Sequence, residues 1–248
     1  MDIKTSVEKR VQWIKGVLEA SGAKGVVYGN SGGKDCTLVS ALVKRATDNV
    51  LGVIMPCQSS RNYGEDKEDA LAAGEMYGIP QIEVDLTAAK EALVAALGDN
   101  LGGEGTDEAG IRSALININP RLRMTALYAV AQPRGYLVAG TGNACEYAMG
   151  YFTKWGDGAY DFNPIADLTV PEIYEHLRYL GSPAHIIEKA PSAGLYAGQT
   201  DEREMGVTYD EITAYLKGLP VPADKKAVMD ALAARSAHKR VPPLRFEG

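Results

Sequence analysis

Short apolar runs alternate with segments of helical period through the first half of this chain. The runs at 25–28, 50–55, 81–84 and 136–139 have the length and composition of buried strands. Apolar residues at helical spacing precede them (Val7, Val11, Ile14, Leu18) and lie between them, up to about Ala46 and near 65–77, 88–97 and 121–131. This alternation predicts an α/β fold with a doubly wound parallel sheet flanked by helices. Such sheets bind ligands beyond the carboxyl ends of their strands.

The rest of the chain reads as loops and helices. Residues 99–110 are rich in Gly, Asp and Glu and predict a flexible loop. Beyond Tyr151, Thr169-x-x-Glu172 and Thr208-x-x-Glu211 fit the capping box that begins a helix. Residues 190–206 show no clear period, and a loop of that length is usually functional or mobile.

Composition narrows the class of protein. A length of 248 residues predicts one domain over residues 1–248. A net charge of -6 argues against nucleic-acid binding, which needs clustered Lys and Arg. The charged start and the lack of a long apolar run predict a cytoplasmic protein with no membrane span. Three cysteines without a C-x-x-C pair predict neither a disulfide framework nor a zinc site.

The most informative stretch joins the first strand to the next helix through a turn of small residues. Gly29, Gly32 and Gly33 let the backbone approach an anion, and the first-turn amides of the helix supply positive potential. Ser31 adds a hydroxyl donor and Lys34 a charge. By itself such a turn is equally compatible with an ordinary connection between a strand and a helix.

Asp35 makes phosphate binding the better interpretation. A carboxylate beside a phosphate is repulsive unless a cation lies between them, which predicts Mg²⁺. The string Ser31-Gly32-Gly33-Lys34-Asp35-Cys36 resembles the SGGxDS loop of the ATP pyrophosphatases, with their flavodoxin/Rossmann-like, adenine nucleotide alpha hydrolase-like fold. The resemblance implies cleavage of ATP between its α and β phosphates. Cys36 replaces the last serine, and a thiol is a weaker hydrogen-bond partner.

Later segments resemble the NAD synthetases within that superfamily. The string from Gly140 to Glu146 is similar to their GTxNxxE motif, which implies Thr141 as an ATP contact and Glu146 as a second metal ligand. Residues 150–158 look like their GYFTKxGDG segment. Similar matches continue at 117–124, before the long helix, and at 164–168, 191–202 and 238–240, so the resemblance covers about Val7 to Arg240.

The resemblance implies an ammonia-dependent enzyme that adenylates the nicotinate carboxylate of deamido-NAD and then amidates it. Asp35, Lys154 and Asp157 are the implied catalytic residues, with Asp157 positioning ammonia or accepting its proton. The further implied contacts are Cys36, Arg61 and Ser192 for ATP, and Arg121, Lys154, Asp161, His238 and Lys239 for substrate. A homodimer is implied, and free ammonia, or ammonia from a separate glutaminase chain, is the expected nitrogen source.

One departure from the family concerns charge. The position that holds a phosphate-contacting lysine in the family is Val170 here. We hypothesise that Lys34 restores this charge, so that Lys34→Ala weakens ATP binding; an unchanged KM for ATP would remove the hypothesis. Two alternatives remain open: another pyrophosphatase-type reaction such as tRNA thiolation, and a module that binds ATP without catalysis.

Overall fold

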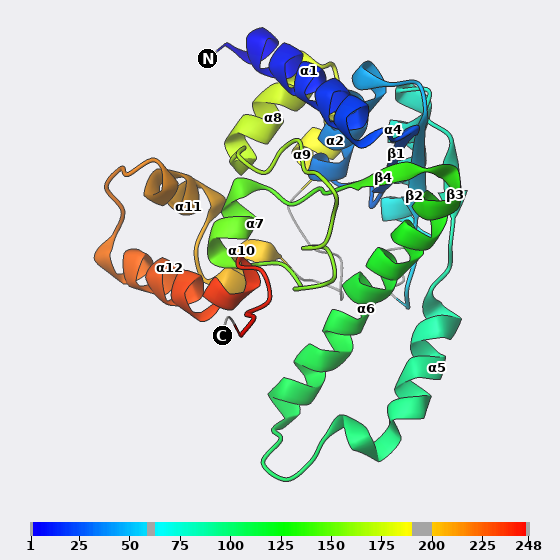
Figure 1. The fold of residues 1–248 in the computed structure, drawn as a ribbon. Coiled ribbons are helices and arrows are strands. Elements are labelled where there is room, and N and C mark those ends of the chain that lie inside the picture. The colour runs from blue at the N-terminus through cyan, green and yellow to red at the C-terminus, as the bar shows by residue number, and fades with distance from the viewer. Residues whose placement is uncertain (1, 59–62, 190–199, 247–248) are drawn as a thin grey trace.

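A computed structural model describes residues 2–58, 63–189 and 200–246 (Figure 1). The strands are β1 (Gly25–Gly29), β2 (Val50–Ile54), β3 (Gln81–Glu83) and β4 (Tyr136–Ala139). The α-helices are α1 (Ile3–Ser21), α2 (Lys34–Ala46), α4 (Glu65–Met76), α5 (Thr87–Leu97), α6 (Glu108–Ala131), α7 (Ala144–Met149), α8 (Val170–Tyr179), α9 (Ala184–Glu188), α10 (Asp201–Met205), α11 (Tyr209–Leu216) and α12 (Ala223–Arg235). Short 3-10 helices are η1 (Gly98–Leu101), η2 (Gln132–Arg134) and η3 (Ala237–Lys239).

The sheet confirms the predicted doubly wound α/β fold. Its strands are parallel and lie in the order β3-β2-β1-β4. Val26 of β1 pairs with Val50 on one side and with Leu137 on the other. The chain therefore builds outward from β1 to β3 and then crosses to the opposite side for β4. This reversal places a topological switch point between β1 and β4, where such folds bind ligands.

Both faces of the sheet are covered, which explains why its strands are apolar without alternation. Successive side chains of a strand point to opposite faces. Val26 and Tyr28 belong to a core cluster shared with α1, α2 and α8, whereas Val27 belongs to a second cluster that α6 covers. Each buried aliphatic side chain contributes about 1.5–3 kcal/mol.

The predictions for the middle of the chain were wrong at two boundaries. The long helix, predicted from Arg121, begins at Glu108, and Pro120 lies inside it. Proline usually marks a helix start because it lacks an N–H, but here the start is set by Asp107, whose side chain accepts a hydrogen bond from the Gly110 amide at 2.6 Å. The string 117–124 is thus helical and does not precede the helix.

The predicted loop at 99–110 is correspondingly shorter. Its first residues belong to η1 and its last three belong to α6. Figure 1 shows α5 and the first half of α6 projecting from the sheet as a two-helix arm.

Both predicted capping boxes are confirmed. Glu172 accepts the Thr169 amide at 2.9 Å at the start of α8, and Glu211 accepts the Thr208 amide at 2.8 Å at the start of α11. These helices and α12 pack with α7 around a third apolar cluster, which includes Cys145, Val170 and Tyr209.

The sequence predicted a long loop at 190–206, but part of this segment is helical. Residues 201–205 form α10, and Met205 is buried in the third cluster, which fixes this short helix. Residues 190–199 lie outside the described part of the chain. Within that described part, no helix combines the length and the hydropathy needed to cross a lipid bilayer.

Candidate active site

A cavity of about 670 Å³ lies at the carboxyl ends of β1, β2 and β4, a volume typical of a small-molecule site. Gly29 and the loop after β1 line one wall, Thr141 and the loop after β4 line another, and residues of α6 close a third. The cavity therefore sits at the switch point that the strand order defines.

The loop after β1 has the geometry of an anion site. Gly33 is extended (φ -82°, ψ 169°) and caps α2, so the first amides of that helix face the cavity without a side-chain cap. Gly32 has φ +74°, and a Cβ there would stand 2.4 Å from the carbonyl oxygen of Asp66. Only glycine fits this close approach between the loop and α4.

Side chains beneath the loop brace it. Asn30 accepts the Gly32 amide at 3.2 Å and donates to the Ala70 carbonyl at 2.8 Å. The Cys36 thiol donates to the Gly33 carbonyl at 3.1 Å and lies 3.5 Å from the Ser31 hydroxyl. Burial raises the pKa of Cys36, so its sulfur stays a neutral thiol. Its predicted contact with ATP stays a prediction.

The loop after β4 brings Glu146 toward Asp35, as the sequence predicted. Asn143 caps α7: its side chain accepts the Glu146 amide at 3.0 Å, and Glu146 accepts the Asn143 amide at 2.9 Å. The side-chain amide of Asn143 also donates to Asp35 at 3.3 Å. One buried asparagine thus links the two predicted metal ligands, although the sequence did not mark it as a site residue.

Lys34 lies between acidic groups. Its ammonium is 2.7 Å from Asp35, its side chain is 7% exposed, and it stands 5.5 Å from the centre of the Tyr209 ring. Burial opposes its charge, but Asp35 and Glu146 outweigh burial and raise the pKa of Lys34. Burial and the charge of Asp35 raise the pKa of Glu146.

Two more carboxylates line the cavity, from α10. Tyr209 donates to Asp201 at 2.8 Å, and the Tyr151 hydroxyl donates to Glu204. Neither residue was predicted to be a site residue, because both lie in a segment without a clear period. Acidic side chains therefore outnumber the buried Lys34 ammonium around this end of the cavity.

The oxygen donors fit a hard divalent cation. Carboxylates are the protein ligands that Mg²⁺ prefers, and Mg²⁺ usually takes only one or two of them together with phosphates and waters. No three His, Cys, Asp or Glu side chains converge into a complete metal site within residues 2–58, 63–189 and 200–246. Asp35 and Glu146 accordingly suit a magnesium ion that a polyphosphate also coordinates.

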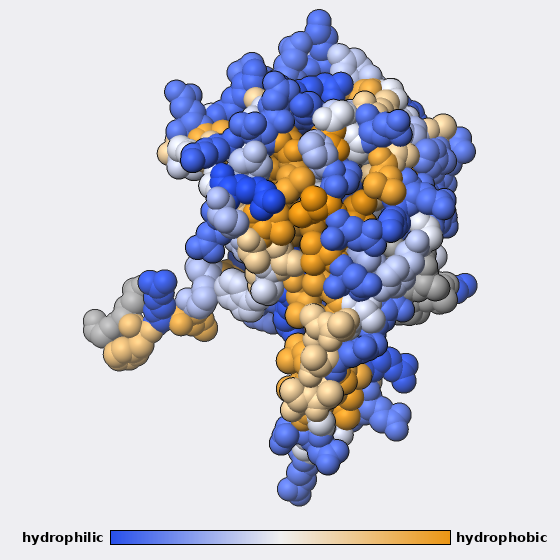
Figure 2. Space-filling view, turned by 90° about the vertical axis from the view of Figure 1, so that its right-hand side faces the viewer, coloured by the Kyte–Doolittle hydropathy of each residue, from blue (hydrophilic) through white to orange (hydrophobic). Residues whose placement is uncertain are grey.

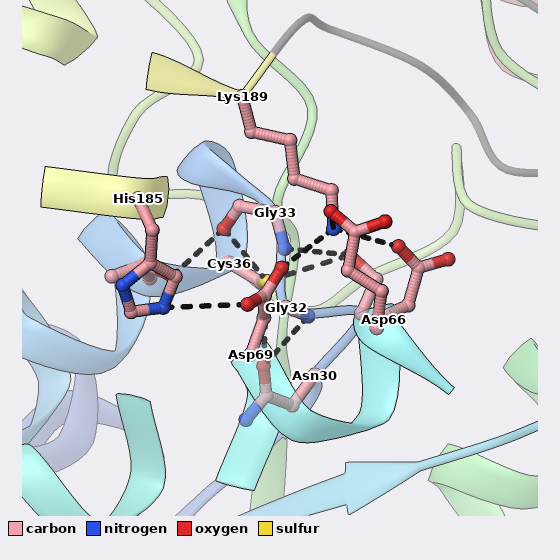
Figure 3. Close-up of polar contacts among 11 residues, drawn as sticks. Asn30, Gly32, Gly33, Cys36, Asp66, Asp69, His185 and Lys189 are labelled. Carbon is pink, nitrogen blue, oxygen red and sulfur yellow. Dashed lines mark hydrogen bonds and ion pairs between the residues drawn. The ribbon is translucent and has the colours of Figure 1, made fainter. Parts of the chain in front are cut away.

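A second lysine lies beside the phosphate loop (Figure 3). Lys189, at the end of α9, is 2.9 Å from Asp66 and 2.5 Å from Asp69, and His185 is 3.3 Å from Asp69. Figure 3 shows these α4 carboxylates next to Gly32. Burial opposes the charge of Lys189, and its bonds to the two aspartates raise its pKa. Neither periodicity nor a motif in the sequence predicted this cluster.

Asp157 occupies another wall of the cavity. The Thr153 amide donates to Asp157 at 2.9 Å, and the Thr153 hydroxyl donates to Asn117 at 2.6 Å. Asp157 lines the cavity with its side chain exposed, and desolvation by the protein around it raises its pKa, against the charges of Lys239 and Arg123.

The residues predicted to contact substrate separate into two groups. Lys239 lines the cavity and donates to the carbonyls of Gly150 and Phe152 at 2.8 and 2.6 Å. Lys154, Arg121, His238 and Asp161 do not line it.

In the second group, side chains that donate to backbone carbonyls link Lys154, Arg121 and His238, whereas Asp161 bonds to β4. Lys154 donates to the His238 carbonyl at 2.7 Å, Arg121 donates to the Lys154 carbonyl at 3.4 Å, and Asp161 accepts the Val138 amide at 2.7 Å. Their substrate contacts remain predictions. Arg61 and Ser192 lie outside the described residues.

Comparisons with known proteins identify the family of this chain. The family model described as NAD synthase matches residues 6–243. The NH(3)-dependent NAD(+) synthetase of Carboxydothermus hydrogenoformans is 44% identical over 234 residues, covering 94% of this chain and 93% of the relative. That of Alkaliphilus oremlandii is 41% identical over 244 residues, covering 98% and 96%.

Solved structures agree as well. The NMN synthetase of Francisella tularensis superposes with a TM-score of 0.91 at 36% identity over all of both chains. The NH3-dependent NAD synthetase of Campylobacter jejuni gives a TM-score of 0.79 at 28% identity, also over all of both chains. With the phosphate loop, the paired carboxylates and the parallel sheet in their expected places, this chain belongs to the NAD synthase family.

Proposed function

We propose that this chain is an ammonia-dependent NAD synthetase that uses ATP to amidate the nicotinate carboxylate of deamido-NAD. The observation that carries this proposal is the meeting of Asp35 and Glu146 across the phosphate loop, linked through Asn143. Asp35 and Glu146 would hold a magnesium ion that neutralises a polyphosphate bound at the loop.

The reaction has two balanced steps. A carboxylate oxygen of the substrate attacks the α-phosphorus of ATP, the bond from that phosphorus to the bridging oxygen breaks, and pyrophosphate leaves. Ammonia then attacks the acyl carbon of the mixed anhydride, AMP departs with the C–O electron pair, and the nitrogen loses a proton. The anhydride is needed because an unactivated carboxylate has too basic a leaving oxygen.

Each wall of the cavity supports one part of this chemistry. The hydroxyl of Ser31 and the amides of Gly33 and of the first turn of α2 bind developing negative charge on the leaving pyrophosphate, whereas the Gly32 amide already donates to Asn30. Magnesium held by Asp35 and Glu146 would neutralise that charge when bound. Asp157, with its pKa raised by desolvation, suits the role of proton acceptor because it is more basic than a fully solvated aspartate.

A homodimer is part of the proposal. Four residues implied for substrate contact, Lys154, Arg121, His238 and Asp161, do not line the cavity of one chain. In α5 no residue is buried and Leu93 is 39% exposed, and Figure 2 shows an apolar stripe running down this face of the molecule. A second copy against the arm would cover this stripe and add a wall to the substrate site. Light scattering at micromolar concentration tests the mass, and a monomer would remove this part.

A second candidate substrate is nicotinate mononucleotide. The very close superposition with the NMN synthetase of Francisella tularensis favours it, because that protein is named for the amidated mononucleotide. The chemistry at the carboxylate is the same for both substrates. They differ only in whether an adenylyl group extends beyond the nicotinate ribose phosphate.

One experiment tests all of these candidates. Purified protein receives ATP, Mg²⁺ and ¹⁵N-ammonium with deamido-NAD, nicotinate mononucleotide, or equal amounts of both. Labelled NAD with AMP and pyrophosphate supports the first candidate. A higher kcat/KM for nicotinate mononucleotide than for deamido-NAD, with labelled NMN as the product, supports the second. ADP and phosphate as products contradict cleavage between the α and β phosphates. ATP binding without turnover of either substrate identifies a module that has lost catalysis.

A further inference from the structure

Lys34 lies in the first turn of α2, a position that usually faces solvent or ligand. It is instead buried, 2.7 Å from Asp35 and within the electrostatic reach of Glu146. The ring of Tyr209 covers its other side at 5.5 Å. The ammonium thus stands where positive charge must lie if two facing carboxylates are to stay close together.

A magnesium ion would neutralise the same two carboxylates. An ammonium and a divalent cation in one small site repel each other, because like charges a few ångströms apart interact strongly where water is excluded. Asp201 and Glu204 add negative charge nearby, but Tyr209 and Tyr151 already donate to them. Without a nucleotide, the charge of Lys34 therefore opposes metal binding at Asp35 and Glu146.

A polyphosphate changes this balance. It brings several negative charges to Ser31, to Gly33 and to the first amides of α2, beside Lys34. The ammonium then gains an anion on the loop side and can leave Asp35. The long, flexible stem of lysine permits such a transfer without any backbone movement.

We propose that Lys34 is an internal counter-ion that holds Asp35 and Glu146 together in the absence of nucleotide and releases them to the metal only when polyphosphate binds. Metal and nucleotide then bind with positive coupling, and the site binds divalent cations only weakly in the absence of nucleotide. The proposal rests on the proposed function only in naming the anion as the polyphosphate of ATP.

The test measures metal binding without turnover. Mn²⁺ is titrated into the protein and free Mn²⁺ is followed by electron paramagnetic resonance, for wild type, Lys34→Met and Lys44→Met. Lys44→Met is the matched control, since it removes a lysine-aspartate pair from the far end of the same helix, where Lys44 lies 2.8 Å from Asp48. Without nucleotide, Lys34→Met is expected to bind Mn²⁺ roughly tenfold more tightly than wild type, and Lys44→Met like wild type.

A second arm adds α,β-methylene-ATP, which cannot be cleaved between its α and β phosphates. The difference between Lys34→Met and wild type is then expected to disappear or reverse, because Lys34 no longer occupies Asp35. Equal Mn²⁺ affinity of wild type and Lys34→Met without nucleotide overturns the proposal. The experiment measures metal binding and not amidation, so it can be interpreted even if the proposed function is wrong.

If Lys34→Met does not fold, a measurement on the wild-type protein still tests the proposal. The ¹⁵N resonances of lysine ammonium groups identify Lys34 by its absence from the spectrum of Lys34→Arg. This signal is expected to stay unchanged on adding Mg²⁺ alone and to move on adding Mg²⁺ with the nucleotide analogue. A shift with Mg²⁺ alone contradicts the counter-ion role.

Discussion

The side-chain amide of Asn143 donates to Asp35 at 3.3 Å while its oxygen accepts the Glu146 amide at 3.0 Å. One fully buried side chain thus both begins α7 and aligns the carboxylate that follows β1. These two tasks can be separated by substitution, because serine caps helices well but has no amide to donate.

We expect Asn143→Ser to stay within about 1 kcal/mol of wild type in free energy of unfolding and to lose roughly tenfold in kcat/KM, a cost of about 1.4 kcal/mol. Asn143→Ala should lose a further ~1 kcal/mol of stability, because the cap is also removed. Urea unfolding and steady-state kinetics measure the two effects. Wild-type kinetics for Asn143→Ser would show that the bond to Asp35 does not align the site.

Gly32 offers a test of the close approach between the phosphate loop and α4. Gly32→Ala puts a methyl 2.4 Å from the Asp66 carbonyl at φ +74°, so it should raise the KM for ATP at least tenfold and destabilise by ~1–3 kcal/mol. Gly78→Ala is the matched control: φ is +61°, but nothing lies within 4 Å of the added Cβ. It should lose only about 1 kcal/mol and keep its KM. Equal kinetic effects in both variants would contradict a specific role for the loop.

Asp157 provides a pH-dependent prediction. Desolvation raises its pKa above the ordinary aspartate value of 3.8, so Asp157 is protonated, and lost as a base, at a higher pH than a fully solvated aspartate would be. The acidic limb of the kcat profile should therefore lie above pH 3.8. Asp157→Asn should lower kcat by about 10²-fold or more and remove that limb, while exposed Asp210→Asn on α11 should change neither. An unchanged acidic limb in Asp157→Asn would assign the titration to another group.

Arg10 and Asp167 give a prediction for stability. Arg10 donates two parallel bonds to Asp167 at 2.6 and 2.8 Å and a third to the Pro164 carbonyl at 2.6 Å, joining α1 to the segment before α8. Hydrogen bonding to Arg10 lowers the pKa of Asp167 below its ordinary value of 3.8. The stabilisation is therefore fully present above the unfolded pKa and is lost as pH falls through the folded pKa.

Because Asp167 is 71% exposed, solvent screening limits the effect, and Asp167→Asn should cost no more than about 1 kcal/mol near neutral pH. The difference from wild type should shrink below pH 4 and vanish in stronger acid. Asp48→Asn, at a carboxylate that is 96% exposed, is the control and should leave stability nearly unchanged. Thermal unfolding from pH 3 to pH 7 measures both. A constant difference across this range would exclude the ion pair as its source.

The sequence predicted those parts of the fold that local chemistry determines. The strand at 136–139 has the predicted bounds because a four-residue apolar run with glycine on both sides is too short for a helix and favours a buried strand. The capping boxes at Thr169 and Thr208 were likewise predicted, since both partners of each box lie three residues apart. The approach of Glu146 to Asp35 follows from parallel strands ending at one edge.

Features that depend on long-range packing were missed. Pro120 resembles a helix start, and only the packing of α6 across the sheet carries the helix through it. Asp201 becomes a cavity residue because Met205 anchors a helix of five residues in the third cluster, which no local pattern indicates. The surroundings of the Lys34–Asp35 pair include Glu146 of α7 and the ring of Tyr209, both remote in sequence.

The position of β4 beside β1 has a consequence for the order in which the chain can fold. Val26 of β1 pairs with Leu137 of β4, and β2, β3 and the two-helix arm all lie between these residues in the sequence. During synthesis one edge of the central strand therefore stays unpaired until Leu137 has emerged, and closing so long a loop is slow. An unpaired apolar edge of this kind is a template for association with other chains. Refolding yield should therefore fall with protein concentration well before the native state loses any stability.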